Sequence, residues 1–399
     1  MKRFLLLLLC VVCMSSMTVY SKDVEEPKNL YAQAAVLMDA DSGRILFAKN
    51  SDRIMAMAST TKIMTCIIAL EDGKLTDVVK VSENASIQPK VHLGMSVGES
   101  YILEDLLYSL MLESHNDSAV AIAEHVGGTV EGFAKLMNNK AEEIGCSNTY
   151  YITPNGLDAS DDIGMHSTTA VDLAKVMSYC ISKSEKKEEF LRITQTSNYT
   201  FSNVEQTRSF SCDNHNSFLT MMEGALSGKT GFTNNAGYCY VGALKRDGRT
   251  FVVSLLACGW PNNQSYKWKD TMKLMEYAVN NYRYENIYEE IEFSSILVKN
   301  GVSKTAEFYD EAYVRVEARH NQESELKILK RSDEKIEVKI EVAPYLSAPV
   351  QKGTSVGYVK YYLNDSLVAE DEIVTSESIE EKNFVWYFKM ILKNYFAMH

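Results

Sequence analysis

The sequence has little positive charge, few histidines and no long apolar run outside its first residues. Its 399 residues carry 41 Lys and Arg against 53 Asp and Glu, which gives a formal net charge of -12 and a pI near 5.2. A surface that binds nucleic acid needs an excess of Lys and Arg, so the charge balance argues against that class of partner. With no internal repeat and no low-complexity tract, the chain is expected to be an acidic, mostly globular protein.

Neither a metal site nor a disulfide framework is indicated. The seven histidines are scattered, without an H-E-x-x-H motif or a paired Cys/His spacing. A chain of this size does not need disulfides to build a core, so we expect buried free thiols, no metal and no cofactor. The cysteines that follow the first apolar run stand singly: Cys66, Cys146, Cys180, Cys212, Cys239 and Cys258.

The N-terminus predicts export. Lys2 and Arg3 precede an apolar run from Phe4 to Met14, and residues 19–21 include the small residues that a signal peptidase requires. We interpret residues 1–21 as a cleaved signal peptide, so we expect an exported protein. A membrane anchor is the alternative, but the run is shorter than the ~20 apolar residues of a spanning helix. Lipid attachment at a cysteine of this run is a further alternative, disfavoured because a large residue precedes each cysteine.

The pattern of periodicities predicts a first domain over residues 22–285. Two short strands joined by a turn come first, helices follow, and two β-rich runs and a closing helix come last. Because the outer strands are free to pair, this order indicates an α/β (α+β) sandwich with an antiparallel sheet and a helical cluster. The expected strands are 34–38, 44–49, 238–244 and 250–257, and the expected helices are 59–70, 103–112, 118–126, 130–144, 168–182 and 269–282.

The remaining residues predict two further parts. Residues 286–375 are dominated by alternating and β-branched stretches without a long helix, which is typical of a small all-β domain. Residues 376–399 carry aromatic and aliphatic residues, with Lys382, Lys389, Lys393 and Trp386 on one helical face. We expect an amphipathic helix that lies in a membrane interface; a helix docked on its own domain is the alternative.

Ser59 and Lys62 are the first candidates for chemistry. On a helix, a lysine three residues after a serine lies on the same face, where it can serve as the base of an alcohol nucleophile. The apolar neighbours of Lys62 would draw it out of water, and burial lowers the pKa of a lysine. The same spacing occurs at Ser184/Lys187, Ser324/Lys327 and Ser332/Lys335, in charged stretches that we interpret as solvated surface.

Two further elements could complete such a site. Ser114, in Ser114-His115-Asn116, could pass a proton between base and leaving group, and the Asn116 amide could hold the lysine and a substrate carbonyl. Ser82-Glu83-Asn84 shows the same triplet, and a helix cap is the ordinary explanation for either. The second element is Lys229-Thr230-Gly231.

Lys229 would attract a carboxylate and help to keep Lys62 neutral. The glycines on both sides of this lysine, Gly228 and Gly231, would let a substrate backbone approach closely. The ordinary explanation for a lone K-T-G is a turn.

Taken together, the order and context of these elements resemble the serine D-alanyl-D-alanine carboxypeptidases, which are low-molecular-mass penicillin-binding proteins of the SxxK acyl-transferases. The likeness covers nearly the whole mature chain. Further similar segments are 34–65, 133–138, 153–158, 166–174, 228–238 and 349–357. The sequence departs from the family at His115, where glycine is usual, at Met57, where proline is common, and at Phe232, where histidine is frequent.

The resemblance implies a β-lactamase/transpeptidase-like fold and a defined reaction. Ser59, Lys62 and Ser114 would be catalytic, and Asn116, Lys229, Thr230 and Gly231 would bind substrate. The substrate would be a peptidoglycan stem pentapeptide ending in D-Ala-D-Ala, hydrolysed through an acyl-enzyme that β-lactams also form. A β-lactamase and a non-catalytic scaffold that binds cell-wall peptide are the alternatives. The sequence does not rank Arg249, Lys267 and Lys269 as further partners of the substrate carboxylate.

Overall fold

The computed structural model describes residues 25–288, 291–319 and 326–397. These residues form two compact units, one of residues 26–283 and one from Tyr284 onward. The predicted signal peptide, residues 1–21, lies outside the described residues and stays a prediction.

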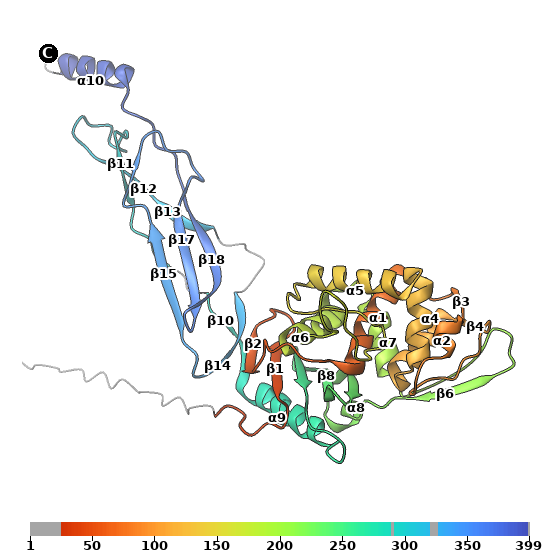
Figure 1. The fold of residues 1–399 in the computed structure, drawn as a ribbon. Helices are drawn as coiled ribbons and strands as arrows, with labels where there is room; N and C mark the ends of the chain where they lie inside the picture. Colours follow the sequence, from red (N-terminus) through yellow and green to blue (C-terminus); the bar gives the residue numbers. More distant parts are fainter. Residues whose placement is uncertain (1–24, 289–290, 320–325, 398–399) are drawn as a thin grey trace, which may run out of the picture. The chain divides into compact units, whose positions relative to one another are not determined.

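A five-stranded antiparallel sheet is the framework of the first unit, with the strand order β2-β1-β9-β8-β7. Its strands are β1 (Ala34–Asp39), β2 (Ile45–Lys49), β7 (Ala225–Thr233), β8 (Gly237–Arg246) and β9 (Arg249–Leu256). Every residue of β1 and β9 is buried, because helices cover both faces of the sheet. Helix α9 (Tyr266–Asn281) packs on one face and the cluster that contains α6 on the other (Figure 1). Strand β7 is left at one edge.

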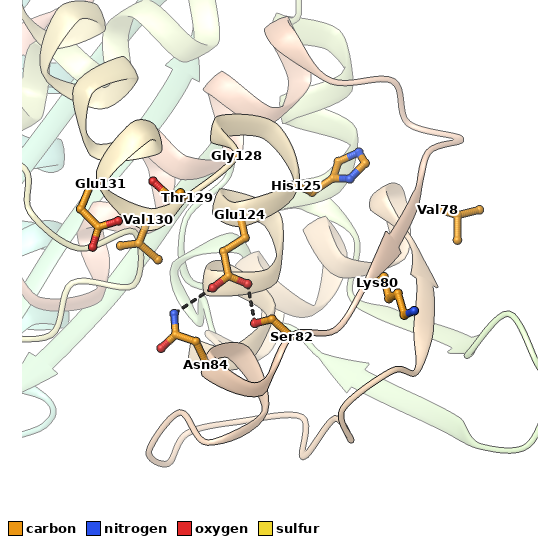
Figure 2. A pocket seen from close by; sticks show the side chains of 10 residues that line it. All are labelled: Val78, Lys80, Ser82, Asn84, Glu124, His125, Gly128, Thr129, Val130 and Glu131. Carbon is orange, nitrogen blue, oxygen red and sulfur yellow. Dashed lines mark hydrogen bonds between the residues drawn. The ribbon is translucent and has the colours of Figure 1, made fainter.

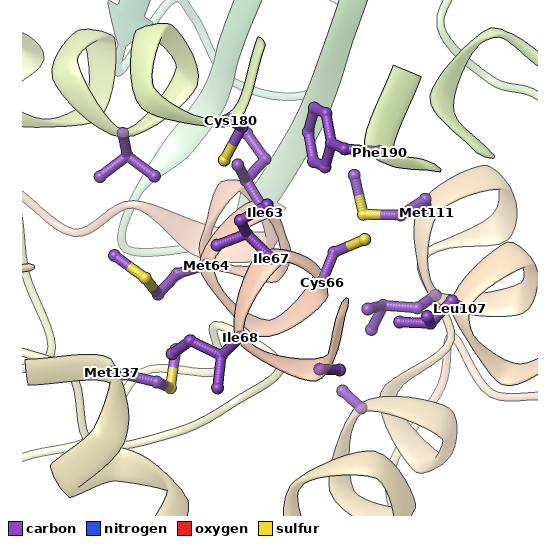
Figure 3. Packing of buried hydrophobic residues seen from close by; sticks show 14 of the residues in the cluster. Ile63, Met64, Cys66, Ile67, Ile68, Leu107, Met111, Met137, Cys180 and Phe190 are labelled. Atoms are coloured by element: carbon purple, nitrogen blue, oxygen red, sulfur yellow. The ribbon is translucent and has the colours of Figure 1, made fainter. Parts of the chain in front are cut away.

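Helix α1 lies at the centre of the helical cluster. All of its residues from Lys62 to Leu70 are buried, since other helices surround it; Figure 3 shows Ile63, Met64 and Ile67 among side chains of these neighbours. The helical segments of the first unit are η1 (Ala58–Thr61), α1 (Lys62–Asp72), α2 (Glu83–Ser86), α3 (Leu103–Tyr108), η2 (Ser109–Glu113), α4 (Asn116–Gly127), α5 (Val130–Ile144), α6 (Ala170–Ser178), η3 (Tyr179–Lys183), α7 (Lys187–Gln195) and α8 (Phe218–Met221). Two small antiparallel pairs complete the unit: β3 (Val78–Lys80) with β4 (Ser100–Ile102), and β5 (Asn198–Ser202) with β6 (Ser209–Asp213).

The second unit is built from strands and ends in one helix. A four-stranded antiparallel sheet of order β13-β18-β17-β15 packs with a three-stranded sheet of order β12-β11-β16 around a core that includes Val314, Val359 and Ile373. Its elements are β10 (Tyr282–Asn286), β11 (Ile296–Lys299), β12 (Ala312–Val314), β13 (Val316–Arg319), β14 (Lys327–Arg331), β15 (Ile336–Val342), β16 (Tyr345–Ser347), β17 (Ser355–Leu363), β18 (Ser366–Thr375) and α10 (Phe384–Ala397).

The predicted fold class is confirmed: an antiparallel sheet with a helical cluster is followed by an all-β unit. The prediction of buried free thiols is also confirmed for the six cysteines of the described chain. The helix expected from Ser59 begins as the 3-10 turn η1 instead, and α1 starts at Lys62. Helix α7 and the β5–β6 hairpin were not predicted from the sequence pattern. Within the described residues, no helix is long and apolar enough to cross a membrane.

Candidate active site

Ser59 and Lys62 lie within hydrogen-bonding distance at the start of α1. The turn η1 carries Ser59 just before the helix, and the Lys62 Nζ atom is 3.0 Å from the Ser59 Oγ atom. Ala58, directly before the serine, has a φ of 49°, a left-handed conformation that is rare for a residue with a side chain. Strain of this kind is typical of functional sites. The spacing identified in the sequence therefore brings a hydroxyl and an amine together.

The other partners of Lys62 fix the direction of its lone pair. Its Nζ atom is 2.9 Å from the Asn116 Oδ1 atom and 2.6 Å from the backbone oxygen of Asn155. The Asn116 Nδ2 atom donates to the Pro89 carbonyl at 3.0 Å, so the amide oxygen must face the lysine. A neutral amine has two N–H bonds and one lone pair. The Asn116 and Asn155 oxygens can only accept, so they take the two N–H bonds of Lys62. Its lone pair is then left to accept the Ser59 proton.

The surroundings favour the neutral form of Lys62. Burial lowers its pKa well below the usual 10.5, the positive charge of Lys229 lowers it further, and the Asp117 carboxylate acts in the opposite direction. The side chain is fully buried, so desolvation disfavours the ammonium form. A neutral lysine beside a serine hydroxyl can act as a general base.

Ser114 is held at a break between two helical segments. It follows η2 with a φ of 68°, in the left-handed region, and its buried Oγ atom has no hydrogen-bond partner among the described residues. Most buried polar groups in proteins are paired. A buried hydroxyl without a partner at the wall of a cavity therefore indicates a group that binds a ligand. The His115 Nδ1 atom lies 2.8 Å from the Ser109 Oγ atom, which is also 2.7 Å from the Ser118 Oγ atom. These contacts fix the backbone on both sides of the break.

The triplet Lys229-Thr230-Gly231 lies on β7, the edge strand of the sheet. Among the described residues, β8 is the only strand that pairs with β7, so no strand occupies the other edge of β7, which can bind an extended peptide. Burial lowers the pKa of Lys229 to about 7, and the Glu113 carboxylate acts in the opposite direction. The triplet therefore lies within an edge strand and not in a turn, which is the ordinary explanation for a lone K-T-G.

The space beside the glycines around Lys229 is occupied by other atoms of the protein itself. A Cβ atom at Gly231 would lie 2.8 Å from the Ser59 amide nitrogen and 3.0 Å from that of Thr60. A Cβ atom at Gly228 would collide with the Tyr240 hydroxyl. The expectation that Gly228 leaves room for a substrate backbone was thus wrong, because Tyr240 fills that space. Gly231 instead lets β7 lie beside the amide of Ser59.

A cavity of about 460 Å³ joins these elements. Among its lining residues are Ser59, Ser114, Lys229, Thr230 and Gly231. Lys62 and Asn116 are buried and are not among the lining residues. All seven predicted site residues therefore meet at one cleft, five on its surface and two beneath it.

Ser82 and Asn84 of the competing triplet line a second hollow of about 460 Å³ (Figure 2). There, Ser82 is the N-cap of α2 and its Oγ atom accepts a hydrogen bond from the Ala85 amide. Ser82 and Asn84 both donate to the Glu124 carboxylate, as Figure 2 shows. The helix-cap explanation is correct for this triplet, since its polar atoms are occupied.

The three other serine–lysine spacings differ from one another. Ser332 and Lys335 are exposed, as expected. Ser184 is buried and donates to the Glu71 carboxylate, so the expectation of solvated surface was wrong for it. Ser324 lies outside the described residues.

Sequence reasoning missed the residues that support Lys62 from the loop before α6. The Asn155 contact uses a backbone oxygen, which no side-chain pattern can reveal. His166 holds this loop: its Nδ1 atom accepts from the Ile152 amide at 2.9 Å, and its Nε2 atom lies 2.8 Å from the Thr61 Oγ1 atom. Burial lowers the pKa of His166 to about 4, so the ring is neutral at pH 7.

Comparison with known proteins gives two family matches. A protein-family model described as Peptidase_S11, D-alanyl-D-alanine carboxypeptidase, matches residues 21–257, and one described as the C-terminal domain of penicillin-binding protein 5 matches residues 292–381. The D-alanyl-D-alanine carboxypeptidase DacF of Bacillus subtilis is 28% identical over 364 residues, which cover 90% of this chain and 88% of that protein.

Two solved structures are similar to this chain over 90% of its length. Penicillin binding protein 5 from Haemophilus influenzae has a TM-score of 0.66 and 25% identity, covering 90% of this chain and 100% of that chain. The D-alanyl-D-alanine carboxypeptidase DacD from Francisella tularensis has a TM-score of 0.68 and 24% identity, over 90% and 97% of the two chains, and shows the likeness of fold.

Proposed function

Because the chain belongs to the D-alanyl-D-alanine carboxypeptidase family, we propose that Ser59 removes the terminal D-alanine from peptidoglycan stem pentapeptides through an acyl-enzyme. The chain is a serine peptidase of this family and a hydrolase. The observation that carries the assignment of Ser59 is the contact of its hydroxyl with a buried lysine whose other two hydrogen-bond partners are oxygens that can only accept.

Acylation begins with proton transfer from Ser59 to neutral Lys62. The Ser59 Oγ atom forms a bond with the carbonyl carbon of the penultimate D-alanine, and the negative charge gathers on the carbonyl oxygen. The Ser59 amide and an amide of β7 after Gly231 stabilise this charge, as oxyanion holes do. The close approach of Gly231 to the Ser59 amide supports this assignment.

Collapse of the intermediate breaks the peptide bond. Ser114 relays the proton from Lys62 to the departing amine of D-alanine, a role supported by its buried, unpartnered hydroxyl at the cavity wall. Asn116 keeps Lys62 in place, while Lys229 and Thr230 bind the terminal carboxylate. Water then hydrolyses the Ser59 ester and restores the free enzyme. A β-lactam acylates the same serine, as it does throughout the family.

We place this reaction outside the cytoplasmic membrane, where its substrate is found. The predicted signal at residues 1–21 supports export. Helix α10 supports contact with a membrane surface, because large apolar side chains including Phe384, Ile391 and Phe396 are exposed. Sedimentation with lipid vesicles tests this contact: the full chain should sediment, and a chain that ends at residue 383 should stay in solution.

Release of D-alanine tests the proposed reaction. A peptide ending in D-Ala-D-Ala should lose one D-alanine with the wild type and none with Ser59→Ala, at equal thermal stability. Slow hydrolysis of penicillin alongside D-alanine release separates this enzyme from a β-lactamase. Unchanged peptide with the wild type would contradict the proposal and favour a scaffold that only binds cell-wall peptide.

A further inference from the structure

A smaller cavity of about 270 Å³ lies where strand β7 ends. Among its lining residues are Asp158, Ser160, Met165, His166 and Asn235. Asn235 lies in the turn between β7 and β8, and the Thr233 Oγ1 atom at the end of β7 donates to the Asp158 Oδ1 atom at 3.1 Å. Strand β7, which forms one wall of the catalytic cleft, therefore leads to this cavity.

The charges of this cavity favour a cation. Asp158 forms no ion pair with a lysine, arginine or histidine of the described residues, so its second oxygen can bind a ligand. No lysine or arginine is among the lining residues, and His166, whose pKa burial lowers to about 4, is neutral at pH 7. The Ser160 hydroxyl and the Asn235 amide oxygen can accept further hydrogen bonds from an ammonium group.

The proposed reaction fixes how a stem peptide runs along β7. Its terminal carboxylate lies at Lys229 and Thr230, and its scissile carbonyl lies at the amide that follows Gly231, which is that of Phe232. The peptide therefore runs antiparallel to β7, with its penultimate D-alanine opposite Phe232. The residue that precedes this alanine in the peptide then lies opposite Thr233, the last residue of the strand.

This register brings the side chain of the preceding peptide residue to Asp158. Residues directly opposite each other in an antiparallel pair have their side chains on the same face, so this side chain lies beside Thr233, whose hydroxyl holds the Asp158 carboxylate. From there a long side chain reaches the cavity, which Met165 lines together with the polar groups. Methylene groups can pack on such an apolar side chain while a terminal ammonium group stays at the carboxylate.

We infer that Asp158 and this cavity bind the side-chain amine of the residue that precedes D-Ala-D-Ala in the stem peptide. This inference rests on the proposed function and adds to it a binding site for the acyl side of the substrate. The residue at this position in peptidoglycan is a diamino acid, and its side-chain amine is charged until a crosslink acylates it. Asp158 thereby makes the enzyme selective for stem peptides whose diamino acid is not acylated.

Two matched peptides test the inference. Both end in Lys-D-Ala-D-Ala with an acetylated N-terminus; one keeps the free amine of the lysine side chain, and in the other this amine is acetylated. Because Asp158 is exposed, the wild type should show a modest preference, with kcat/KM about threefold to tenfold higher for the free amine. In Asp158→Asn, which keeps an acceptor for the Thr233 hydroxyl, the two values should become equal. A higher ionic strength should reduce the preference of the wild type and leave the variant unaffected.

Asp162→Asn is the matched control, because it removes the same charge from an exposed aspartate of the same loop that does not line the cavity. It should keep the wild-type preference, and turnover of the acetylated peptide reports whether each variant has a folded site. Equal values for the two peptides in the wild type, or a preference that Asp158→Asn retains or that Asp162→Asn also loses, would overturn the inference. If the wild type releases D-alanine from neither peptide, the proposed function fails, and this inference fails with it.

Discussion

Two Ser-x-Asn triplets of this chain look alike in sequence and differ in the hydrogen bonds and the backbone conformation of their serines. Ser82 caps a short helix, and its hydroxyl and the Asn84 amide are occupied by the Ala85 amide and the Glu124 carboxylate. Ser114 lies in a left-handed conformation, its hydroxyl has no hydrogen-bond partner in the part of the chain that the structure describes, and Asn116 holds a buried lysine. The triplet therefore has no catalytic function by itself. Ser114 and Asn116 can take part in chemistry because Asn116 contacts the buried Lys62 and the backbone at Ser114 leaves its hydroxyl available.

The two triplets also contribute differently to stability. The first satisfies a helix end and stabilises the fold. The second keeps a buried hydroxyl free and a backbone in an uncommon region, which costs stability. Substitutions at equivalent positions of the two triplets can therefore separate catalysis from folding.

The largest expected effect is on turnover. Ser114→Ala should lower kcat for D-alanine release by about 10²- to 10⁴-fold, the range of a lost proton-transfer group. Ser82→Ala should leave kcat within a factor of two, because its hydroxyl lies in the other hollow. Steady-state kinetics with a peptide ending in D-Ala-D-Ala measures both, and a similar loss in the two variants would break the comparison.

A smaller effect on kcat is expected at the middle residues of the two triplets, His115 and Glu83. His115→Ala removes the contact with Ser109 and loosens the break that holds Ser114, so kcat should fall by about tenfold, as small displacements in active sites do. We attribute the acid limb of the pH–kcat profile to protonation of the base Lys62, so the loss of His115, whose pKa is lowered by burial, should leave that limb in place. A displaced acid limb would show that His115 takes part in proton transfer. Glu83→Ala, at an exposed position, should change neither quantity.

The smallest expected effect is on stability, where Ser82→Ala should have a larger effect than Ser114→Ala. Ser82→Ala should lower the free energy of unfolding by about 1 kcal/mol through the lost cap. Ser114→Ala should leave it unchanged or raise it, because the variant no longer buries an unpaired hydroxyl. Denaturant titration of both variants decides the point; a larger loss in Ser114→Ala would mean that this hydroxyl has a structural partner.

The sequence predicted the parts of the site whose geometry follows from regular structure. Because residues three apart on a helix lie on the same face, the spacing predicted the contact of Lys62 with Ser59. The glycines around Lys229 were expected to admit a substrate backbone, and at Gly228 the Tyr240 hydroxyl fills that space instead. The β-rich runs 238–244 and 250–257 predicted β8 and β9, because strands buried on both faces are continuously apolar.

What the sequence could not predict depends on tertiary contacts. The Asn155 oxygen that orients Lys62 belongs to the backbone, so no side-chain pattern in the sequence predicts this contact. Ser184 stands among charges and is still buried, because Glu71 accepts its hydrogen bond. Lys267 lines the cleft and Lys269 does not. The side of α9 that faces the cleft is set by the packing of this helix on the sheet, which the sequence pattern does not show.

The covalent step is the centre of this account, and its most direct test is the mass of the protein after exposure to benzylpenicillin. The wild type should gain the mass of one penicilloyl group, and peptide mapping should place it on Ser59. Ser59→Ala should gain nothing. A group found on another residue, or wild-type protein that stays unlabelled while it is folded, would contradict the role of Ser59 as the nucleophile.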